Sequence, residues 1–193
     1  MKKILIITAH PSTKGFTHSI ASSFKEGAES RGNQVEVLDL YTTDLQIPFL
    51  NFENKEDMRN LSDHVKRLQQ KITDCTDMVF IHPLWWMGTP AIMKNFFDNV
   101  FTSHFAFKYV DGKPVGLLKN KRAHIFFTSD GNMWWFKTAI FLLKPIKFFW
   151  SMGLLHFCGL KHKTMMVFDK SFKRSQKDRE SFLKRVRKVG ESM

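Results

Sequence analysis

The chain has 193 residues, which is enough for one α/β domain that buries most of its apolar surface. Its 43% hydrophobic and 25% charged residues exclude a disordered polymer. The formal net charge of +12 at pH 7 is compatible with nucleic acid, an anionic membrane surface or a polyanionic cofactor as binding partner. We expect a single domain over residues 1–193.

Two segments resemble targeting signals, and neither fits one. The apolar run after the first lysines is too short for a signal peptide and ends at His10-Pro11 instead of a cleavage site. The apolar stretch 139–158 is interrupted by two lysines and a proline, which argues against a membrane span. Two cysteines imply no disulfide framework, so the protein is expected to be cytoplasmic.

Strand-like and helix-like segments alternate along the chain. Five apolar runs predict strands at 3–8, 35–40, 78–81, 123–128 and 164–168. Helices are predicted at 17–31, 56–72 and 89–101, in a long apolar region that reaches residue 158, and in a basic segment at the C-terminus. Residues 105–120 form an excursion with a turn at Asp111-Gly112. This alternation predicts an α/β fold with a parallel sheet and right-handed crossovers.

The turn after the first strand decides between two doubly wound folds. A dinucleotide-binding unit would place Gly-x-Gly-x-x-Gly there, whereas residues 8–18 contain one glycine, Gly15. We therefore predict a flavodoxin-like three-layer sandwich whose five-stranded parallel sheet has the order 2-1-3-4-5.

The same turn is rich in hydroxyl and imidazole side chains. It leads into a helix, whose free N–H groups and dipole favour a bound phosphate. We assign this loop to a cofactor site through His10, Ser12, Thr17 and His18.

Two further loops follow the third and fourth predicted strands, and all three loops should meet beyond the carboxyl ends of the strands. The second loop contributes Pro83, Leu84, Trp85, Trp86 and Met87, and the third contributes Thr128, Ser129, Asp130 and Gly131. A phosphate site beside aromatic and glycine-containing loops suits flavin mononucleotide. Backbone N–H groups near Trp86, Met87, Ser129 and Gly131 would bond the polar edge of its ring. No Cys/His cluster has metal-ligand spacing, so no metal site is predicted.

Residues 83–101, which begin Pro-Leu-Trp-Trp-Met-Gly-Thr-Pro-Ala-Ile-Met-Lys, resemble the flavin loop and following helix of a quinone reductase family. That family includes DT-diaphorase and the bacterial modulator-of-drug-activity and potassium-efflux accessory reductases. Residues 153–159, Gly-Leu-Leu-His-Phe-Cys-Gly, resemble a second family segment. The His10-Pro11 turn with Phe16-Thr17 is similar to the family's phosphate loop, and residues 128–131 match its ring-binding turn in part.

The resemblance implies a flavoenzyme that takes hydride from NADPH or NADH and passes it by a ping-pong mechanism to a quinone-like acceptor. It also implies a homodimer with flavin sites at the subunit interface, with FMN favoured over FAD because the chain lacks a long C-terminal extension. Residues 134–150 would line the pocket or meet the partner subunit. Mammalian members have a Tyr and a His where residues 132–140 carry Trp134, Trp135 and Lys137, so no catalytic residue is assigned.

Two alternatives stay open at this point. The chain could be an electron carrier, although such carriers are commonly acidic and this chain is basic. It could also be a regulatory subunit whose basic C-terminal helix contacts a protein partner or a membrane surface. Nucleic acid is not expected as a partner, because the basic residues form no known recognition module.

Overall fold

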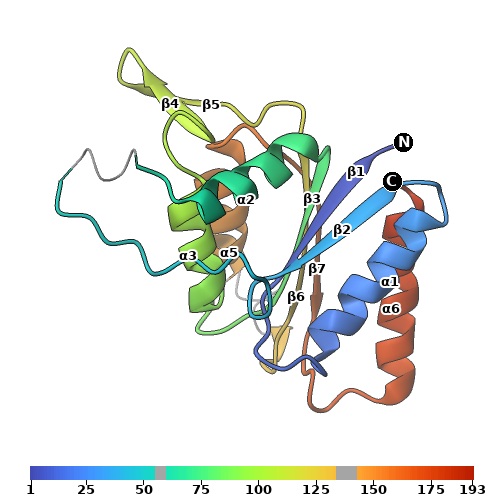
Figure 1. The fold of residues 1–193 in the computed structure, drawn as a ribbon. Coiled ribbons are helices and arrows are strands. Elements are labelled where there is room, and N and C mark those ends of the chain that lie inside the picture. The colour runs from blue at the N-terminus through green and yellow to red at the C-terminus, as the bar shows by residue number, and fades with distance from the viewer. Residues whose placement is uncertain (55–59, 134–142) are drawn as a thin grey trace.

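The computed structural model describes residues 1–54, 60–133 and 143–193, with only the backbone described at 143–145. Five parallel strands form one sheet in the order β2-β1-β3-β6-β7 (Figure 1). The strands are β1 Lys3–Thr8, β2 Gln34–Asp39, β3 Asp77–Pro83, β6 Arg122–Thr128 and β7 Lys161–Phe168. The predicted fold and strand order are confirmed, since the five long strands taken in sequence have the order 2-1-3-4-5.

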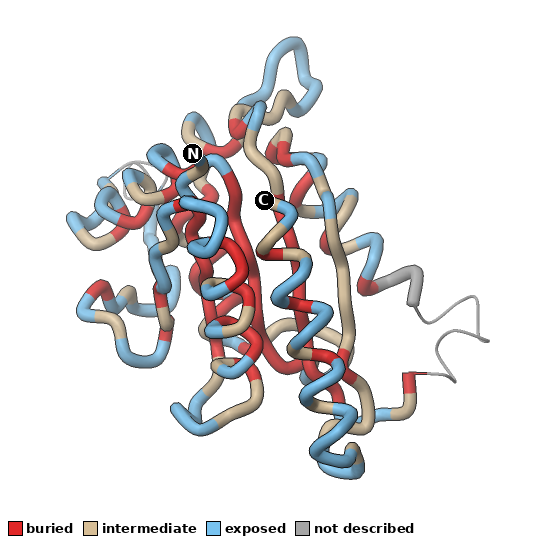
Figure 2. Tube along the Cα trace, turned by 90° about the vertical axis from the view of Figure 1, so that its right-hand side faces the viewer, coloured by how far each residue is buried: buried red, intermediate tan, exposed pale blue. Residues whose placement is uncertain are grey.

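Helices cover both faces of this sheet (Figures 1 and 2). They are α1 Phe16–Glu29, α2 Asp63–Asp74, α3 Ala91–Val100, α5 Leu143–Phe148, the π-helix η2 Phe149–His156 and α6 Gln176–Glu191. Successive side chains of β1 point to opposite faces of the sheet and pack against the helices on each face. Ile4 and Ile6 pack towards α1 and α6, and Leu5 and Ile7 pack towards α2, α3 and η2. Within the described residues, no helix is long and apolar enough to cross a membrane.

The second helix begins later than predicted. Residues 56–72 were expected to be helical, whereas α2 spans Asp63–Asp74, and residues 55–59 lie outside the described part. The Ser62 side chain accepts a hydrogen bond from the Val65 N–H at 3.3 Å and caps the helix at that point. The prediction from hydrophobic periodicity placed the helix start too early, because it ignored the N-cap residue Ser62.

Two features of the chain's second half refine the prediction. The excursion is a hairpin of β4 Phe107–Val110 and β5 Lys113–Gly116, and Asp111 and Gly112 both have positive φ in its two-residue turn, as predicted. The long apolar helical region is α5 followed by η2, so its last two turns are π-helical and not α-helical. Its part at 134–142 lies outside the described residues.

Helices α1 and α6 approach each other closely at two glycines. A methyl group at Gly27 would overlap the carbonyl oxygen of Arg187, and one at Gly190 would overlap that of Phe24. Glycine inside a helix costs about 1 kcal/mol relative to alanine. Here it allows the two backbones to meet, which places α6 at a defined height along α1.

We call the side of the sheet where the strands begin the amino edge, and its centre is a buried carboxylate. Asp77 has no exposed side-chain surface, and its carboxylate lies 2.7 Å from Arg122 Nη2 and 3.6 Å from His124 Nε2. Thr76 Oγ1 donates to the same group at 2.7 Å. Burial alone would raise the pKa of Asp77, but the nearby His124 ring and the hydrogen bonds from Arg122 and Thr76 outweigh it and lower the pKa to about 2.

Candidate functional site

The ends of β1, β3 and β6 lie side by side at the opposite side of the sheet, which we call the carboxyl edge. Thr8 is paired with Ile81, and Pro83 with Thr128, so the three following loops leave the sheet as neighbours. The Leu84 N–H also donates to the Thr128 carbonyl at 2.7 Å. The structure therefore brings together the three loops that the sequence assigned to one site.

The first loop holds a helix N-terminus open. The Ser12 N–H donates to His10 Nδ1 at 3.0 Å, and Gly15 donates to the Ser12 carbonyl at 3.0 Å. Gly15 is the N-cap residue of α1 and provides no side-chain cap, and the first turn contains no acidic residue. A Cβ at Gly15 would overlap the His10 ring. The His18 N–H donates to the Gly15 carbonyl at 3.0 Å, whereas the N–H groups of Phe16 and Thr17 bond to no described residue and are left for a ligand, in the arrangement that suits an anion.

Polar groups without partners surround this helix start. His18 Nε2 and Thr8 Oγ1 are buried and form no hydrogen bond with any described residue. Thr17 is buried and Ser12 is exposed, and the His10 and His18 rings meet edge to face with their centroids 6.2 Å apart. Buried polar atoms in native proteins nearly always have partners, so this pair of unsatisfied atoms indicates a group that the protein is built to bind.

The second loop is a two-residue turn with unfavourable backbone geometry. Trp85 and Gly88 exchange two backbone hydrogen bonds of 3.1 and 2.8 Å, and the residues between them, Trp86 and Met87, have φ of 51° and 62°. A turn of this type normally contains Asn or Gly, because positive φ costs other residues about 1–2 kcal/mol each. Their N–H groups bond to no described residue, and the Trp86 side chain is fully exposed. Such strain is characteristic of ligand-binding loops.

The third loop is tied to the segment after β7. The Ser129 N–H donates to the Phe168 carbonyl at 2.9 Å, and the Gly131 N–H donates to Ser129 Oγ at 3.2 Å. The Asp130 carboxylate accepts a hydrogen bond from the Ser171 hydroxyl. Of the four backbone donors predicted for the ring edge, Ser129 and Gly131 already donate within the protein, which leaves Trp86 and Met87.

A fourth loop joins the site, and the sequence analysis did not assign it. Asp169, the first residue after β7, accepts the Met133 N–H at 3.2 Å and is paired with Arg174. Lys170 donates its N–H to the Gly131 carbonyl at 3.2 Å. The signal that could have found this loop is the polar run Asp169-Lys170-Ser171 at the carboxyl end of the fifth predicted strand.

A buried histidine lies directly below the second loop and was also not assigned. His82 is completely buried at the end of β3 and stacks with Phe127 and Trp150, at centroid distances of 6.1 and 5.5 Å. Burial lowers its pKa to about 4, against a smaller opposing effect of its 2.7 Å hydrogen bond to the Pro83 carbonyl. The ring is therefore neutral at pH 7, with Nδ1 donating and Nε2 buried without a partner.

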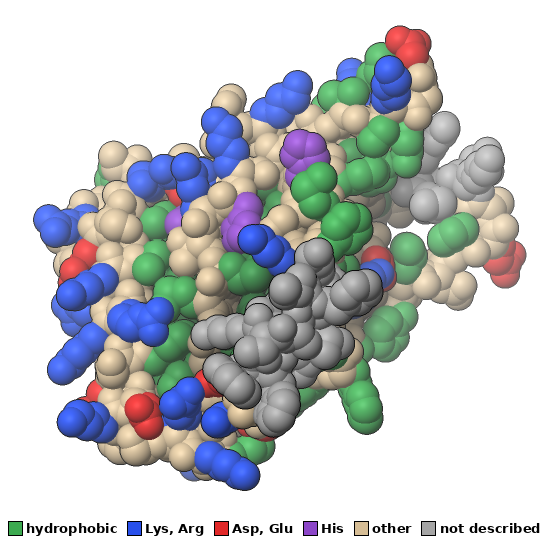
Figure 3. All heavy atoms as spheres, turned by 180° about the vertical axis from the view of Figure 1, so that it is seen from behind, with side chains coloured by type: hydrophobic (Ala, Val, Ile, Leu, Met, Phe, Trp, Pro, Cys, Tyr) green, Lys and Arg blue, Asp and Glu red, His purple; other side chains and the backbone are tan. Residues whose placement is uncertain are grey.

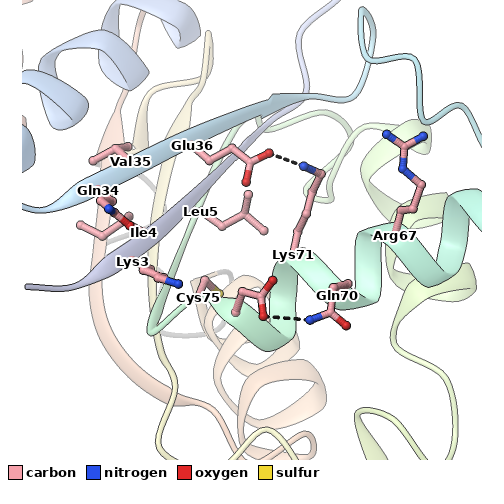
Figure 4. A pocket seen from close by; sticks show the side chains of 11 residues that line it. Lys3, Ile4, Leu5, Gln34, Val35, Glu36, Arg67, Gln70, Lys71 and Cys75 are labelled. Carbon is pink, nitrogen blue, oxygen red and sulfur yellow. Dashed lines mark hydrogen bonds and ion pairs between the residues drawn. The ribbon is translucent and has the colours of Figure 1, made fainter.

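A hollow with a volume of about 510 Å³ lies away from these loops, between β1, β2 and α2 towards the amino edge (Figure 4). Lys71 is paired with Glu36 there, and Gln70 donates to Asp74 at 2.8 Å. Its charged groups of both signs satisfy one another, and no aromatic side chain lines it. The hollow therefore lacks the features that a flat phosphorylated ligand needs.

The sequence as a whole matches the family model for the flavodoxin-like fold over residues 2–189. It is also 32% identical over 167 residues to an uncharacterized NAD(P)H oxidoreductase of Haemophilus influenzae, a match that covers 85% of this chain and 82% of that protein. The chain belongs to the flavodoxin-like NAD(P)H oxidoreductases.

Other members of the family carry more specific names. An FMN-dependent NADH:quinone oxidoreductase of Coprothermobacter proteolyticus is 30% identical over 139 residues, which is 68% of this chain and 69% of that protein. The solved structure of an NAD(P)H:quinone oxidoreductase from Methanothermobacter marburgensis superposes with a TM-score of 0.84. It is 25% identical in sequence, and the match covers 98% of this chain and 96% of that one. This solved structure has the same fold as the present chain over nearly its whole length.

Proposed function

We propose that the protein binds FMN at the carboxyl edge and transfers hydride from NAD(P)H to a quinone or a similar small electrophilic acceptor in a ping-pong cycle. The names of its relatives support this proposal, since they include an FMN-dependent NADH:quinone oxidoreductase. The observation that carries it is the pair of unbonded N–H groups at Trp86 and Met87. A turn with two positive φ angles holds them beside an uncapped helix start.

The residues present fit a flavin nucleotide. The start of α1 would hold the phosphate, with Ser12 and Thr17 as hydroxyl donors and His10 and His18 beside them. Pro83, Leu84 and Trp85 would pack against the ring, and Trp86 and Met87 would donate to its polar edge. Thr128, Ser129, Asp130 and Gly131 would border the same ring from the third loop. The unsatisfied His18 Nε2 is the structural reason to expect a bonded group at the phosphate end.

The bound flavin would supply the hydride-accepting and hydride-donating ring, and the chain would supply position and charge stabilisation. The Trp86 and Met87 N–H groups would stabilise negative charge that develops at the polar ring edge. Because the turn already holds these donors in place, they need no reorganisation when that charge develops. His82 is neutral at pH 7, so it adds no charge below the ring.

We further propose that two copies of the chain, each one domain over residues 1–193, form a homodimer around this site. Trp86 is fully exposed, and Phe148 and Met152 expose more than half of their surface. Large apolar side chains that are exposed in the protomer are typical of a surface that a partner covers. In such a dimer the partner would complete the wall of the ring pocket, where nicotinamide and acceptor would bind in turn.

The direct test is anaerobic spectroscopy of the purified protein after reconstitution with FMN. We expect the flavin absorbance bands to bleach on addition of NADPH or NADH, and to return on addition of a water-soluble quinone. Initial rates at several fixed quinone concentrations should give parallel double-reciprocal lines, which are the signature of a ping-pong cycle.

The alternative outcomes separate the parts of the proposal. A flavin that binds but stays oxidised with both nucleotides would identify an electron carrier instead of a reductase. Intersecting lines would overturn the ping-pong order while leaving the reductase activity. Failure to bind FMN and FAD alike would overturn the cofactor site itself.

A further inference from the structure

The positive charge of the chain is concentrated near its C-terminus. Residues 161–188 contain 11 Lys and Arg against three Asp and Glu, in a chain whose net charge is +12. Seen from behind, Lys and Arg side chains gather over the half of the molecule where α6 lies, on the left of Figure 3. This region therefore presents a strong positive field on one side of the protein.

Six of these cations form what we call the basic face, and none of them has an ion-pair partner among the described residues. The basic face consists of Lys170, Lys173, Lys177, Lys184, Arg185 and Lys188. Lys177, Lys184 and Lys188 are spaced by seven and four residues. They therefore lie along one side of α6, opposite the buried Phe182 and Val186.

The acidic residues of the same stretch offset only part of this charge. Asp169 is paired with Arg174, which is not part of the basic face. Asp178 closes the capping box with Ser175 and lies within electrostatic range of Lys177, and Glu180 accepts a hydrogen bond from Gln176 at 3.1 Å. Three carboxylates against 11 cations leave a large excess of positive charge for an external anion.

An exposed phenylalanine lies at the end of the basic face. The Phe172 side chain is 86% exposed in the loop between β7 and α6, with Lys170 and Lys173 on either side. The loop is well fixed. Lys173 donates its N–H to the Lys170 carbonyl at 2.8 Å, and Ser171 bonds both Asp130 and the Arg179 guanidinium. A structured turn therefore presents an apolar ring to solvent among cations.

We propose that the basic face docks the protein on an anionic lipid surface, with the Phe172 ring inserted at the headgroup level. Clustered lysines bind anionic lipid headgroups through their charge, and an aromatic ring between them is suited to the interface between water and hydrocarbon. A nucleic-acid groove would explain the lysines, but it gives no reason for a single protruding phenylalanine. A protein partner would require a wider apolar patch around that ring.

The loop that carries Phe172 lies next to the candidate cofactor site. Residues 169–174 follow β7 at the carboxyl edge and hold Asp130 and Gly131, so docking through Phe172 brings the candidate cofactor site close to the lipid surface. The docking itself is independent of the proposed reductase activity, since charge and exposure alone carry it.

Co-sedimentation with vesicles tests the proposal on the full-length protein. We expect binding to phosphatidylcholine vesicles that contain phosphatidylserine, little binding to phosphatidylcholine alone, and loss of binding at high salt because salt screens the charges. The triple variant K177Q/K184Q/K188Q should bind about 100-fold more weakly, since each lysine near an anionic surface contributes about a fivefold factor. Phe172→Ser keeps the charge and should still weaken binding several-fold.

The matched control is K108Q/K113Q/K119Q, which removes the same charge from exposed lysines in and after the β4–β5 hairpin. It should bind almost as well as the unmodified protein. Equal loss in both triple variants, with unchanged thermal unfolding, would show that only net charge matters and would overturn the basic face. Absence of vesicle binding together with tight binding of an RNA oligonucleotide would reassign the face to nucleic acid.

Discussion

The two edges of the central sheet treat their charged and polar groups differently. At the amino edge, the buried Asp77 is surrounded by Arg122, His124 and Thr76. Asp77 Oδ1 and His124 Nε2, which make no formal hydrogen bond, face each other at 3.6 Å, and His162 Nε2 is buried there without a hydrogen bond to the described residues. At the carboxyl edge, polar atoms of Thr8, His18 and His82 are buried without a hydrogen bond to the described residues, and none of them forms an ion pair within that part of the chain.

Positive φ at non-glycine residues occurs at both edges. Asn120, two residues before β6 at the amino edge, has φ of 70°, and Trp86 and Met87 adopt positive φ side by side in one turn at the carboxyl edge. The polar groups are therefore what distinguishes the edges. The amino edge pairs its buried charge internally, and the carboxyl edge leaves donors and acceptors for a ligand.

The largest effect on the free energy of unfolding is expected from a substitution at the amino edge alone. Asp77→Ala would leave Arg122 and His124 without their shared anion, and loss of one member of a buried ion pair costs about 3–5 kcal/mol. We expect about 3 kcal/mol, because the Arg122 side chain is 31% exposed and is partly screened by solvent. Urea unfolding would measure the loss.

The same variant should bind FMN as the unmodified protein does whenever it is folded. A large change in flavin affinity at low urea would contradict the separation of the two edges.

During acid unfolding, the stability contributions of His82 at the carboxyl edge and Asp77 at the amino edge should be lost over different pH ranges. Burial lowers the pKa of His82 to about 4 from its usual 6.5, so on acidification the unfolded chain binds a proton at this residue before the folded chain does. His82 therefore contributes stability above about pH 6.5 that is lost as the pH falls towards 4, by roughly 3 kcal/mol. Asp77, with a pKa of about 2, contributes stability that is lost only between about pH 4 and pH 2.

Stability curves of His82→Phe and of Asp77→Asn, measured from pH 7 to pH 2, would assign the two windows. In His82→Phe, the loss of stability between about pH 6.5 and pH 4 should disappear, and the loss between about pH 4 and pH 2 should remain. An unchanged upper window would show that His82 titrates normally in the folded state.

A smaller effect is expected from Trp86→Ala. The side chain is fully exposed and packs on nothing in the protomer, so the free energy of unfolding should change by less than about 0.5 kcal/mol. Flavin affinity or the rate of flavin reduction should fall by about tenfold, because an aromatic contact with the ligand is lost. Phe24→Ala is the control, since that buried ring should cost stability and leave the rate per bound flavin unchanged.

The last substitution should increase the free energy of unfolding, whereas the others lower it or leave it unchanged. Met87→Gly removes a side chain from a residue with φ of 62° and should stabilise the unliganded protein by about 0.5–1 kcal/mol. Thermal unfolding without flavin would measure the gain. A destabilised variant would show that Met87 packing outweighs the strain of the turn.

The fold could be predicted from the sequence because the strands are buried on both faces and therefore form continuous apolar runs, such as residues 3–8 and 123–128. The positions of the three loops followed from that order, since parallel strands all end at one edge. Local chemistry was predictable to the same degree at the hairpin, where Asp-Gly indicates its turn directly.

The remaining features depend on contacts between distant residues. Asp77, Arg122 and His124 come together only through strand pairing, and Ser171 reaches Asp130 only because β7 lies beside β6. The turn at Trp86 and Met87 carries no Gly or Asn signal, because its backbone conformation is imposed from outside the turn. The use of the Ser129 and Gly131 N–H groups by the protein likewise follows from neighbouring segments and not from local sequence.

The crossing of α1 and α6 at Gly27 and Gly190 has a consequence for the evolution of the protein. Neither glycine can change without separating the helices, so drift at these two positions is blocked. The outer side of α6 makes no ion pair through Lys177, Lys184 or Lys188 with the described residues, so substitutions of these lysines leave the fold intact. A lineage can therefore retune the charge that it displays, residue by residue, while the helix that displays it stays at the same height and rotation.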